Sequence, residues 1–439
     1  MNRYRLFAQY VFPSVVAFAL SGIYAIVDGF FVGHSMGDAG LSAINIAFPV
    51  VSLMQSIGTG IGMGGAVLWT VRKGTGDEEA AGKYVRATLL LLIAASAAVT
   101  AGVFPFTGAI LKMFGAEGEI FRLGREYLNV IVLGAGFQIL ATGIVPIIRN
   151  NGSSFFALAV MVSGFLSNIF LDYLFVWVFE MGTEGAAAAT ILGQMVTTVL
   201  SVIYLFVRRL PVFGPMSGFG RMAGNIGKIG IAPFGLTLSP MISLMLINRF
   251  SMSEGGAEAV ACYACIAYAL TIVQVLMQGV GDGSQPLMSR YYGKGRYSQV
   301  KEIRRMAYVS ALVLAAVCNG ILFFARERLG YLFGASESTR LMVAEVLPVF
   351  LVGLIFYAFS RITTSGFYAT EKNVYSYFCV YAEPLLLLAL LFVLPLLWGQ
   401  TGVWWSVVFS QVLTAGLALV LKTREDQEGR RQAGRPAED

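Results

Sequence analysis

Long apolar stretches separated by short polar segments make up most of this chain. A helix needs about 20 apolar residues to cross a bilayer. The pattern therefore predicts an all-α membrane protein. We expect its twelve transmembrane helices over residues 9–33, 41–70, 85–106, 126–148, 155–179, 186–207, 229–250, 259–288, 306–325, 341–360, 375–397 and 402–421.

The two halves of the chain repeat each other at an offset of about 219 residues. Ser52-Leu-Met-Gln55 aligns with Thr271-Ile-Val-Gln274, and Gly74-x-Gly76 aligns with Gly293-x-Gly295. A duplicated apolar bundle is typical of transporters, which bind cargo between two halves. Because each half holds an even number of spans, we expect two six-helix bundles related by a parallel pseudo-two-fold repeat.

The repeat also predicts how the chain is divided. We expect a first lobe over 1–207, a linker over 208–228, a second lobe over 229–422 and a tail over 423–439. The linker is basic and contains Gly and Pro, so we expect it on the cytoplasmic surface. The tail is charged and poor in apolar residues, which predicts disorder.

The distribution of charge predicts the orientation. Only 13% of residues are charged, whereas 57% are hydrophobic. With the N-terminus inside, 24 basic residues fall in inner segments and seven in outer ones, out of 31 in total. This excess predicts a multi-pass protein of the cell (inner) membrane with both termini cytoplasmic. No basic-aromatic stripe exists to bind nucleic acid.

Few side chains offer catalytic or metal chemistry. His34 is the only histidine, and no nucleophile–base pair is visible, so we expect no enzyme activity and no cofactor. Cys262-x-x-Cys265 lacks the second pair that a zinc site needs. Gly60-x-Gly62-x-x-Gly65 lies inside an apolar helix rather than after a strand, and it indicates close helix packing instead of dinucleotide binding.

Two acidic residues of the first half are the main functional candidates. A charge at the bilayer centre costs about 2.5–3.5 kcal/mol, so ionisable residues inside spans are functional candidates by default. Asp28 and Asp172 each lie roughly 17 residues from the inner end of an outward-running span, at similar depth. Asn168 shares a helix face with Asp172, and Thr190 and Tyr127 lie near the outer starts of neighbouring spans.

These five residues have the chemistry of a cation site. Two carboxylates, an amide and hydroxyl groups are hard oxygen ligands, and mutual repulsion favours holding a proton. The same group suits a proton, a cationic drug, or a sodium ion held by Asp28, Asn168, Asp172 and Thr190. The alternative is structural, with each acid capping a helix end near the interface.

The second half lacks this set, because Asn248 stands at the position that corresponds to Asp28. Glu383 is the remaining acid well inside a span, and it precedes Pro384, which predicts a kink. Either Glu383 contacts cationic cargo, together with Asp28 and Asn248, or it pairs with an arginine such as Arg361.

The chain resembles the prokaryotic branch of the multidrug and toxic compound extrusion (MATE) family, in the multidrug/oligosaccharidyl-lipid/polysaccharide flippase superfamily. The resemblance rests on Val27-Asp28-x-Phe-Phe-Val-Gly33, Arg72-Lys73-Gly74-x-Gly76-Asp77, Asp282-Gly-Ser-Gln285-Pro286 and Asn168-x-x-x-Asp172. It implies a V-shaped transporter. It further implies that Asp28 carries the proton, that Asn168, Asp172 and Thr190 bind the cation, and that Tyr127 orients the site.

The sequence and the resemblance together predict a multidrug efflux antiporter. We expect it to work as a monomer among membrane lipids and to export small cationic aromatic compounds by alternating access, in exchange for protons or sodium. The nearest alternative is a flippase of lipids or lipid-linked oligosaccharides from the same superfamily. Such a flippase is expected to have a basic central cavity, but the intramembrane arginines here cluster at span ends.

Overall fold

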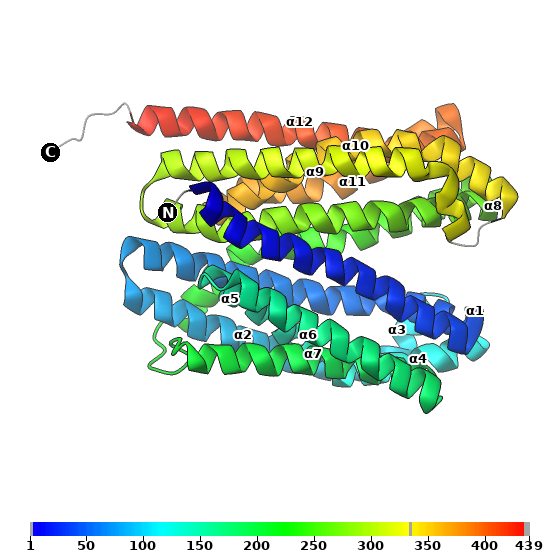
Figure 1. Cartoon of the computed structure of the whole chain (residues 1–439), viewed down its shortest axis with the longest axis horizontal. Coiled ribbons are helices and arrows are strands. Elements are labelled where there is room, and N and C mark those ends of the chain that lie inside the picture. The colour runs from blue at the N-terminus through cyan, green and yellow to red at the C-terminus, as the bar shows by residue number, and fades with distance from the viewer. Residues whose placement is uncertain (1–2, 333–335, 434–439) are drawn as a thin grey trace. The chain divides into compact units, whose positions relative to one another are not determined.

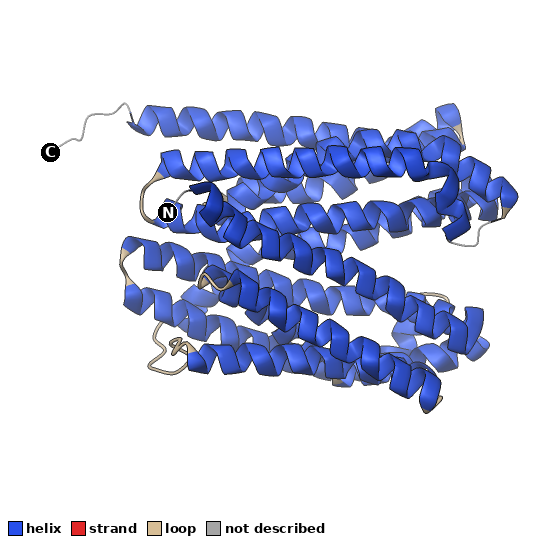
Figure 2. Cartoon of the chain, viewed as in Figure 1, coloured by secondary structure: helices blue, strands red, loops and turns tan. Residues whose placement is uncertain are grey.

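The computed structural model describes residues 3–332 and 336–433, and these residues form helices and short connections without strands (Figure 2). Figure 1 labels the α-helices by their number in chain order. Their bounds are α1 (Arg3–Thr75), α2 (Glu78–Val103), η1 (Phe104–Phe106), α3 (Thr107–Met113), α4 (Gly118–Leu133), α5 (Ala135–Asn150), α6 (Ser154–Asp172), η2 (Tyr173–Val178), α7 (Gly182–Val207), α8 (Phe219–Gly293), α9 (Tyr297–Leu332), α10 (Glu337–Ala369), α11 (Asn373–Trp398) and α12 (Gln400–Ala433).

The described helices account for the predicted spans. Ten are long and apolar enough to cross a membrane, and the pair α4–α5, bent by 55°, adds an eleventh. The count of ten treats α8 as one helix, although its 75 residues break at Gly256. Divided at that break, α8 supplies two spans, and the predicted all-α fold with twelve spans is confirmed.

The internal repeat is visible in the backbone. Helices begin at residues 78, 118 and 154 in the first half and at 297, 337 and 373 in the second, 219 residues apart in each pair. The breaks in α1 and α8 recur at the same spacing, at Gly37 (φ 59°, ψ −154°) and Gly256 (φ 67°, ψ −162°). Glycine adopts this backbone conformation without the steric penalty that other residues incur, so each break lets one helix end and the next begin.

The described contacts divide the chain into two compact units. Unit 1 contains residues 1–238 and 282–300, and unit 2 contains residues 239–281 and 301–439. Unit 1 thus combines the first six spans with the start and the end of α8. The lobe boundaries drawn from the sequence remain a prediction.

Glycine residues allow the second half of α1 to pack closely against α5. A Cβ atom on Gly58 would lie 2.6 Å from the backbone oxygen of Ile139, and one on Gly62 would overlap the backbone of Gly143. Because helices approach this closely only where side chains are absent, the sequence interpretation of this glycine run as a packing surface is confirmed.

The predicted linker is shorter than expected. We expected it to continue to residue 228, but α8 already begins at Phe219, so the connection after Val207 covers 208–218. The apolar pattern could not predict the added helix, because its residues include Arg221, Asn225 and Lys228. Backbone hydrogen bonds can extend a helix beyond its apolar span, since they do not depend on hydrophobicity.

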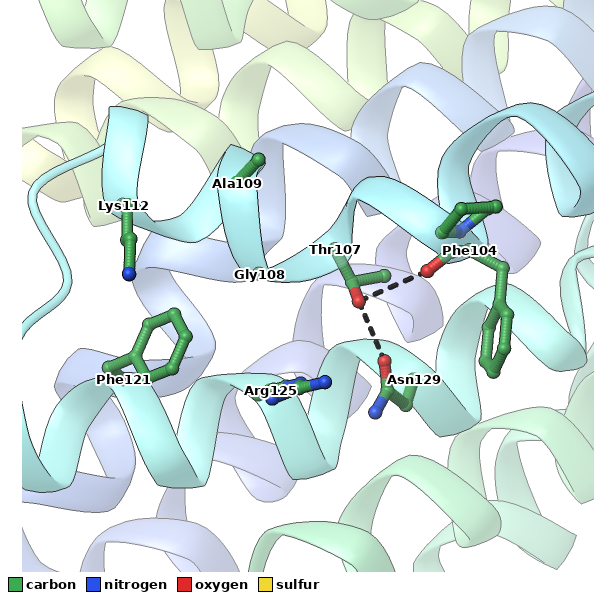
Figure 3. A pocket seen from close by; sticks show the side chains of 9 residues that line it. Phe104, Thr107, Gly108, Ala109, Lys112, Phe121, Arg125 and Asn129 are labelled. Atoms are coloured by element: carbon green, nitrogen blue, oxygen red, sulfur yellow. Dashed lines mark hydrogen bonds between the residues drawn. The ribbon is translucent and has the colours of Figure 1, made fainter.

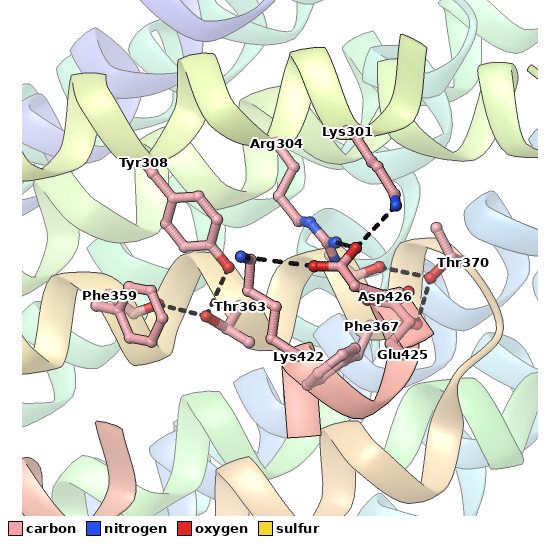
Figure 4. Close-up of polar contacts among 11 residues, drawn as sticks. Lys301, Arg304, Tyr308, Phe359, Thr363, Phe367, Thr370, Lys422, Glu425 and Asp426 are labelled. Atoms are coloured by element: carbon pink, nitrogen blue, oxygen red, sulfur yellow. Dashed lines mark hydrogen bonds and ion pairs between the residues drawn. The ribbon is translucent and has the colours of Figure 1, made fainter. Parts of the chain in front are cut away.

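The prediction of a disordered tail from residue 423 is wrong for its first part, because α12 continues to Ala433. Glu425 accepts a 2.6 Å hydrogen bond from the buried Arg304 of α9, and Asp426 forms an ion pair of 2.9 Å with Lys301 (Figure 4). These ion pairs hold the polar extension against α9. The last part of the predicted tail, 434–439, lies outside the described residues.

Candidate functional site

Four helices of unit 1 bring the predicted acidic group together. Asp28 lies in α1, Tyr127 in α4, Asp172 at the end of α6 and Thr190 in α7. Asp28 and Asp172 lie within electrostatic range of each other and of Tyr127. The depth argument from the sequence therefore identified residues that meet in the fold.

Close packing of α6 against α7 positions the amide of the group. A Cβ atom on Gly193 of α7 would lie 2.8 Å from Cβ of Asn168 and 2.9 Å from the backbone oxygen of Gly164. A side chain at either glycine would push the helices apart. Because both glycines lack a side chain, Asn168, one turn before Asp172, lies directly on α7.

Several polar atoms of this group are buried and lack a hydrogen-bond partner among the described residues. Asp172 is 1% exposed and Asn168 is 2% exposed. The carboxyl groups of Asp28 and Asp172 are close enough to interact. Yet Oδ1 of Asp28, both carboxyl oxygens of Asp172 and both amide atoms of Asn168 have no hydrogen bond of good geometry within the described part of the chain.

Such a group can hold one positive charge. A buried polar atom without a partner costs about 1–3 kcal/mol, and more if it is charged. A proton shared by the two carboxyl groups, or a cation bound between their oxygens, would remove that cost. In residues 3–332 and 336–433 no three His, Cys, Asp or Glu side chains gather as metal ligands, so amide and hydroxyl oxygens would complete the donor set.

Tyr24 belongs to the group but escaped the sequence analysis. Its ring stacks on Phe165, with 5.2 Å between centroids, and its hydroxyl lies close enough to the side chain of Thr190 to interact with it. It also lies within electrostatic range of Asp28 and Asp172. The available signal was its position four residues before Asp28, on the same face of one helix.

The end of α6 also carries an unpredicted feature. The six residues after Asp172 form the π-helical element η2. Wider π turns occur frequently at functional sites. Here the wider turn follows directly after the buried acid of the group, and no apolar or glycine signal in the sequence predicted it.

The remaining candidates lie in unit 2. Glu383 of α11 lies close enough to the side chains of Gln411 of α12 and Tyr263 of α8 to interact with both. Asn248 of α8 has a buried side-chain oxygen without a hydrogen-bond partner among the described atoms. Both therefore belong to a different unit from Asp28.

A second buried polar group in unit 1 was not identified as a site from the sequence. Arg149, at the end of α5, donates a 3.1 Å hydrogen bond to Ser14 and lies 3.9 Å from a carboxyl oxygen of Asp282. Asn150 and Gln285 exchange amide hydrogen bonds of 3.0 and 3.3 Å. These contacts join α5 and α1 to the last part of α8, and spacing along the chain could not reveal them.

Comparison with known proteins assigns the fold to a family. The MatE family model matches residues 13–174 and 230–393, one segment in each half. The multidrug export protein MepA of Staphylococcus aureus (strain NCTC 8325 / PS 47) is 24% identical over 425 residues, which cover 95% of this chain and 93% of MepA. MepA of Staphylococcus saprophyticus is 23% identical over 420 residues, which cover 93% of this chain and 91% of that protein.

Solved structures share the fold. An outward-facing multidrug resistance MATE family transporter of the MOP superfamily superimposes with a TM-score of 0.91 at 21% identity, over 97% of this chain and 96% of the other. A MOP superfamily transporter from Pyrococcus furiosus gives 0.90 at 23% identity, over 96% and 95%. Because the family model matches both halves and the helical fold agrees throughout, the chain belongs to the MatE family, whose members are membrane transporters and not enzymes.

Proposed function

We propose that this transporter is a multidrug efflux antiporter that exports cationic aromatic compounds in exchange for protons or sodium ions. The observation that carries the proposal is the acidic group of unit 1. Two carboxyl groups interact inside a membrane helix bundle, and three of their four oxygens, Oδ1 of Asp28 and both oxygens of Asp172, lack hydrogen-bond partners of good geometry within the described residues. A group of this kind is costly unless it binds a positive charge.

Each residue of the group then has a role. Asp28 accepts the proton or contacts the ion, and Asp172, Asn168 and Thr190 supply oxygen ligands. Tyr127 and Tyr24 orient the carboxyl groups, since both lie within electrostatic range of the two acids. A sodium ion would use the same carboxylate, amide and hydroxyl oxygens, which are the hard ligands such an ion prefers.

Coupling follows because the proton or sodium ion and the cationic cargo compete for the acidic group. A proton or ion that enters from outside neutralises the acidic group and displaces cationic cargo, and the neutral group favours the return to the inward-facing state. One elementary charge that crosses 100 mV supplies about 2.3 kcal/mol. This free energy supports a concentration ratio of roughly fifty-fold, since 1.36 kcal/mol corresponds to tenfold.

The cargo class is supported by the relatives and by the site. The curated relative of Staphylococcus aureus is named a multidrug export protein. An acidic site favours cations, and aromatic side chains, at 13% of this chain, suit planar compounds. We also propose Glu383 and Asn248 of unit 2 as cargo contacts, in addition to Asp28 of unit 1.

The charge distribution supports the placement in the membrane. We propose that both termini face the cytoplasm and that the protein works as a monomer in the cell membrane. The first lobe, over 1–207, would hold the coupling group. The second lobe would span 229–422.

Transport of ethidium in proteoliposomes tests the proposal. We expect ethidium movement when either an imposed sodium gradient or an imposed pH gradient is the only driving force, and the effective gradient identifies the coupling ion. Absence of movement under both gradients, with protein that remains monodisperse, would contradict drug antiport. The lipid flippase would then be the function to test.

A further inference from the structure

A pocket in unit 1, separate from the acidic group, has the features of an anion site. It has a volume of about 490 Å³ and lies between η1 and α3 on one side and α4 on the other (Figure 3). Phe121, Arg125 and Asn129 line it from α4 at four-residue spacing, so they share one helix face. Lys112 lines it from α3.

The two basic residues of the pocket, Lys112 and Arg125, form no ion pair with an acidic residue of the described chain. Arg122, on the same helix as Arg125, pairs with Glu126 at 2.9 Å and Glu119 at 3.8 Å. Nζ of Lys112 lies 5.5 Å from the ring centroid of Phe121, which directs the ammonium group along the pocket wall. Two positive charges therefore face the pocket without a counter-charge.

A side-chain amide completes the polar lining. The hydroxyl of Thr107 donates a 2.8 Å hydrogen bond to Oδ1 of Asn129, as Figure 3 shows. This bond fixes the amide so that its nitrogen, which can only donate, is left for another partner. A basic pair with an amide donor suits a phosphate group, which accepts several hydrogen bonds.

The surface beside the pocket is apolar and exposed. Phe106 of η1 is 59% exposed and Met113 at the end of α3 is 74% exposed. Phe104 and Pro105 extend this apolar surface into the pocket wall itself. An apolar surface next to a basic pocket matches a ligand that carries both a phosphate and hydrocarbon chains.

The other half of the chain does not repeat the basic lining of the pocket residue for residue. Of the seven basic residues that the sequence predicts in outer segments, Lys112, Arg122 and Arg125 lie on α3 and α4, while Arg326, Arg328 and Arg340 lie on α9 and α10 of the other half. Positions in the other half, 219 residues later, hold Tyr331 and Ala344 in place of Lys112 and Arg125. The repeated fold therefore does not require basic residues at these two positions.

We propose that this pocket binds the headgroup of an anionic phospholipid, with its phosphate on Lys112, Arg125 and the amide of Asn129 and its acyl chains on the apolar surface of η1 and α3. Free inorganic phosphate shares the same anionic chemistry but would make no use of that surface. The pocket contains no residue of the acidic group, so this proposal does not depend on the proposed antiport.

Native mass spectrometry of the purified full-length protein in neutral detergent tests the proposal. Phosphatidylglycerol, phosphatidylcholine and inorganic phosphate are titrated separately, and phosphate is also tested as a competitor. We expect tighter binding of phosphatidylglycerol than of phosphatidylcholine. The Lys112→Gln/Arg125→Gln variant should lose about thirty-fold in phosphatidylglycerol affinity, because each basic residue near the surface contributes about 1 kcal/mol.

Arg122→Gln is the matched control, because Arg122 lies on the same helix but already pairs with Glu119 and Glu126. It should bind phosphatidylglycerol as the unchanged protein does. If the double variant does not fold, the two single variants test the site, with an expected loss of about fivefold each. Unchanged affinity in the pocket variants, an equal loss in Arg122→Gln, or full displacement of phosphatidylglycerol by millimolar phosphate would overturn the proposal.

Discussion

Asp172 combines almost complete burial with two carboxyl oxygens that have no well-aligned partner among the described residues. Burial without partners is costly, so a side chain of this kind persists where another requirement outweighs stability. The neighbouring Asp28, Asn168 and Tyr24 share that environment. For these residues, binding of a positive charge would offset the unfavourable free energy of burying the carboxyl groups.

The Asp172→Asn variant tests that function. We expect the ion concentration for half-maximal ethidium transport to rise about tenfold or more, because an interaction with a charged group contributes about 1.5–3 kcal/mol. Transport kinetics at graded sodium concentration or pH measure the change. Glu184→Gln, at an exposed acid in the first turn of α7, is the control and should behave as the unchanged protein. Identical ion dependence in Asp172→Asn would reduce Asp172 to a structural residue.

Helix packing explains how the elements hold the site in place. Gly62 in α1 faces the backbone of Gly143 in α5, and Gly193 in α7 faces Asn168 in α6. Neither contact leaves space for a side chain. The elements around the acidic group are thus fixed by backbone approach as well as by apolar burial.

Gly62→Leu should lower the thermal stability of the purified protein, because overpacking costs about 1–3 kcal/mol. Gly102→Leu is its matched control, since a Cβ atom on Gly102 of α2 would have no neighbour within 4 Å. A thermal unfolding scan of both variants in the same detergent measures the difference. Equal melting temperatures would show that α1 and α5 do not need this close contact.

The ion pairs at the end of α12 should contribute to the stability of the protein. Removal of residues 423–439 takes Glu425 and Asp426 from Arg304, whose side chain is 5% exposed. We expect a loss of about 1.5–3 kcal/mol in stability, which is the usual contribution of a hydrogen bond to a charged group. Removal of residues 428–439 alone keeps both acids and should change little. If the two truncated proteins have the same melting temperature, these ion pairs do not stabilise unit 2.

The sequence predicted elements better than it predicted their polar extensions. Apolar length identified the spans, and the 219-residue offset correctly related both halves, because hydrophobicity and repetition are properties of the chain itself. It did not predict the helical part of the tail, since the anchor of Glu425 is Arg304, more than a hundred residues away. The contacts of Arg149 were missed for the same reason, because their partners lie on other helices. Tyr24 was missed although its spacing from Asp28 on one helix face was visible in the sequence.

For the whole molecule, the distribution of basic residues predicts the orientation in the membrane. The excess of basic residues in alternate connections predicts cytoplasmic termini. The turn after α1 and the turn before α4 should then face opposite sides of the membrane. Thr75, the last residue of α1, and Glu117, the residue before α4, are exposed positions at which a cysteine can be introduced for labelling.

Labelling of single cysteines measures this orientation. In a background without the four native cysteines, a membrane-impermeant maleimide added to intact cells should label the Glu117→Cys variant. The Thr75→Cys variant should react only after the membrane is permeabilised. The opposite pattern would invert the topology, and it would move the basic pocket between α3 and α4 to the cytoplasmic side.

Cargo-dependent ion movement in proteoliposomes tests most directly whether the acidic group of unit 1 couples ions to cargo. It is measured in parallel for the unchanged protein, Asp28→Asn and Glu383→Gln. We expect ethidium to drive counter-movement of protons or sodium in the unchanged protein, and we expect Asp28→Asn to abolish it. Because the coupling group lies in unit 1, Glu383→Gln in unit 2 should retain ion movement even if cargo affinity falls. Undiminished counter-movement in a folded Asp28→Asn variant would contradict the account.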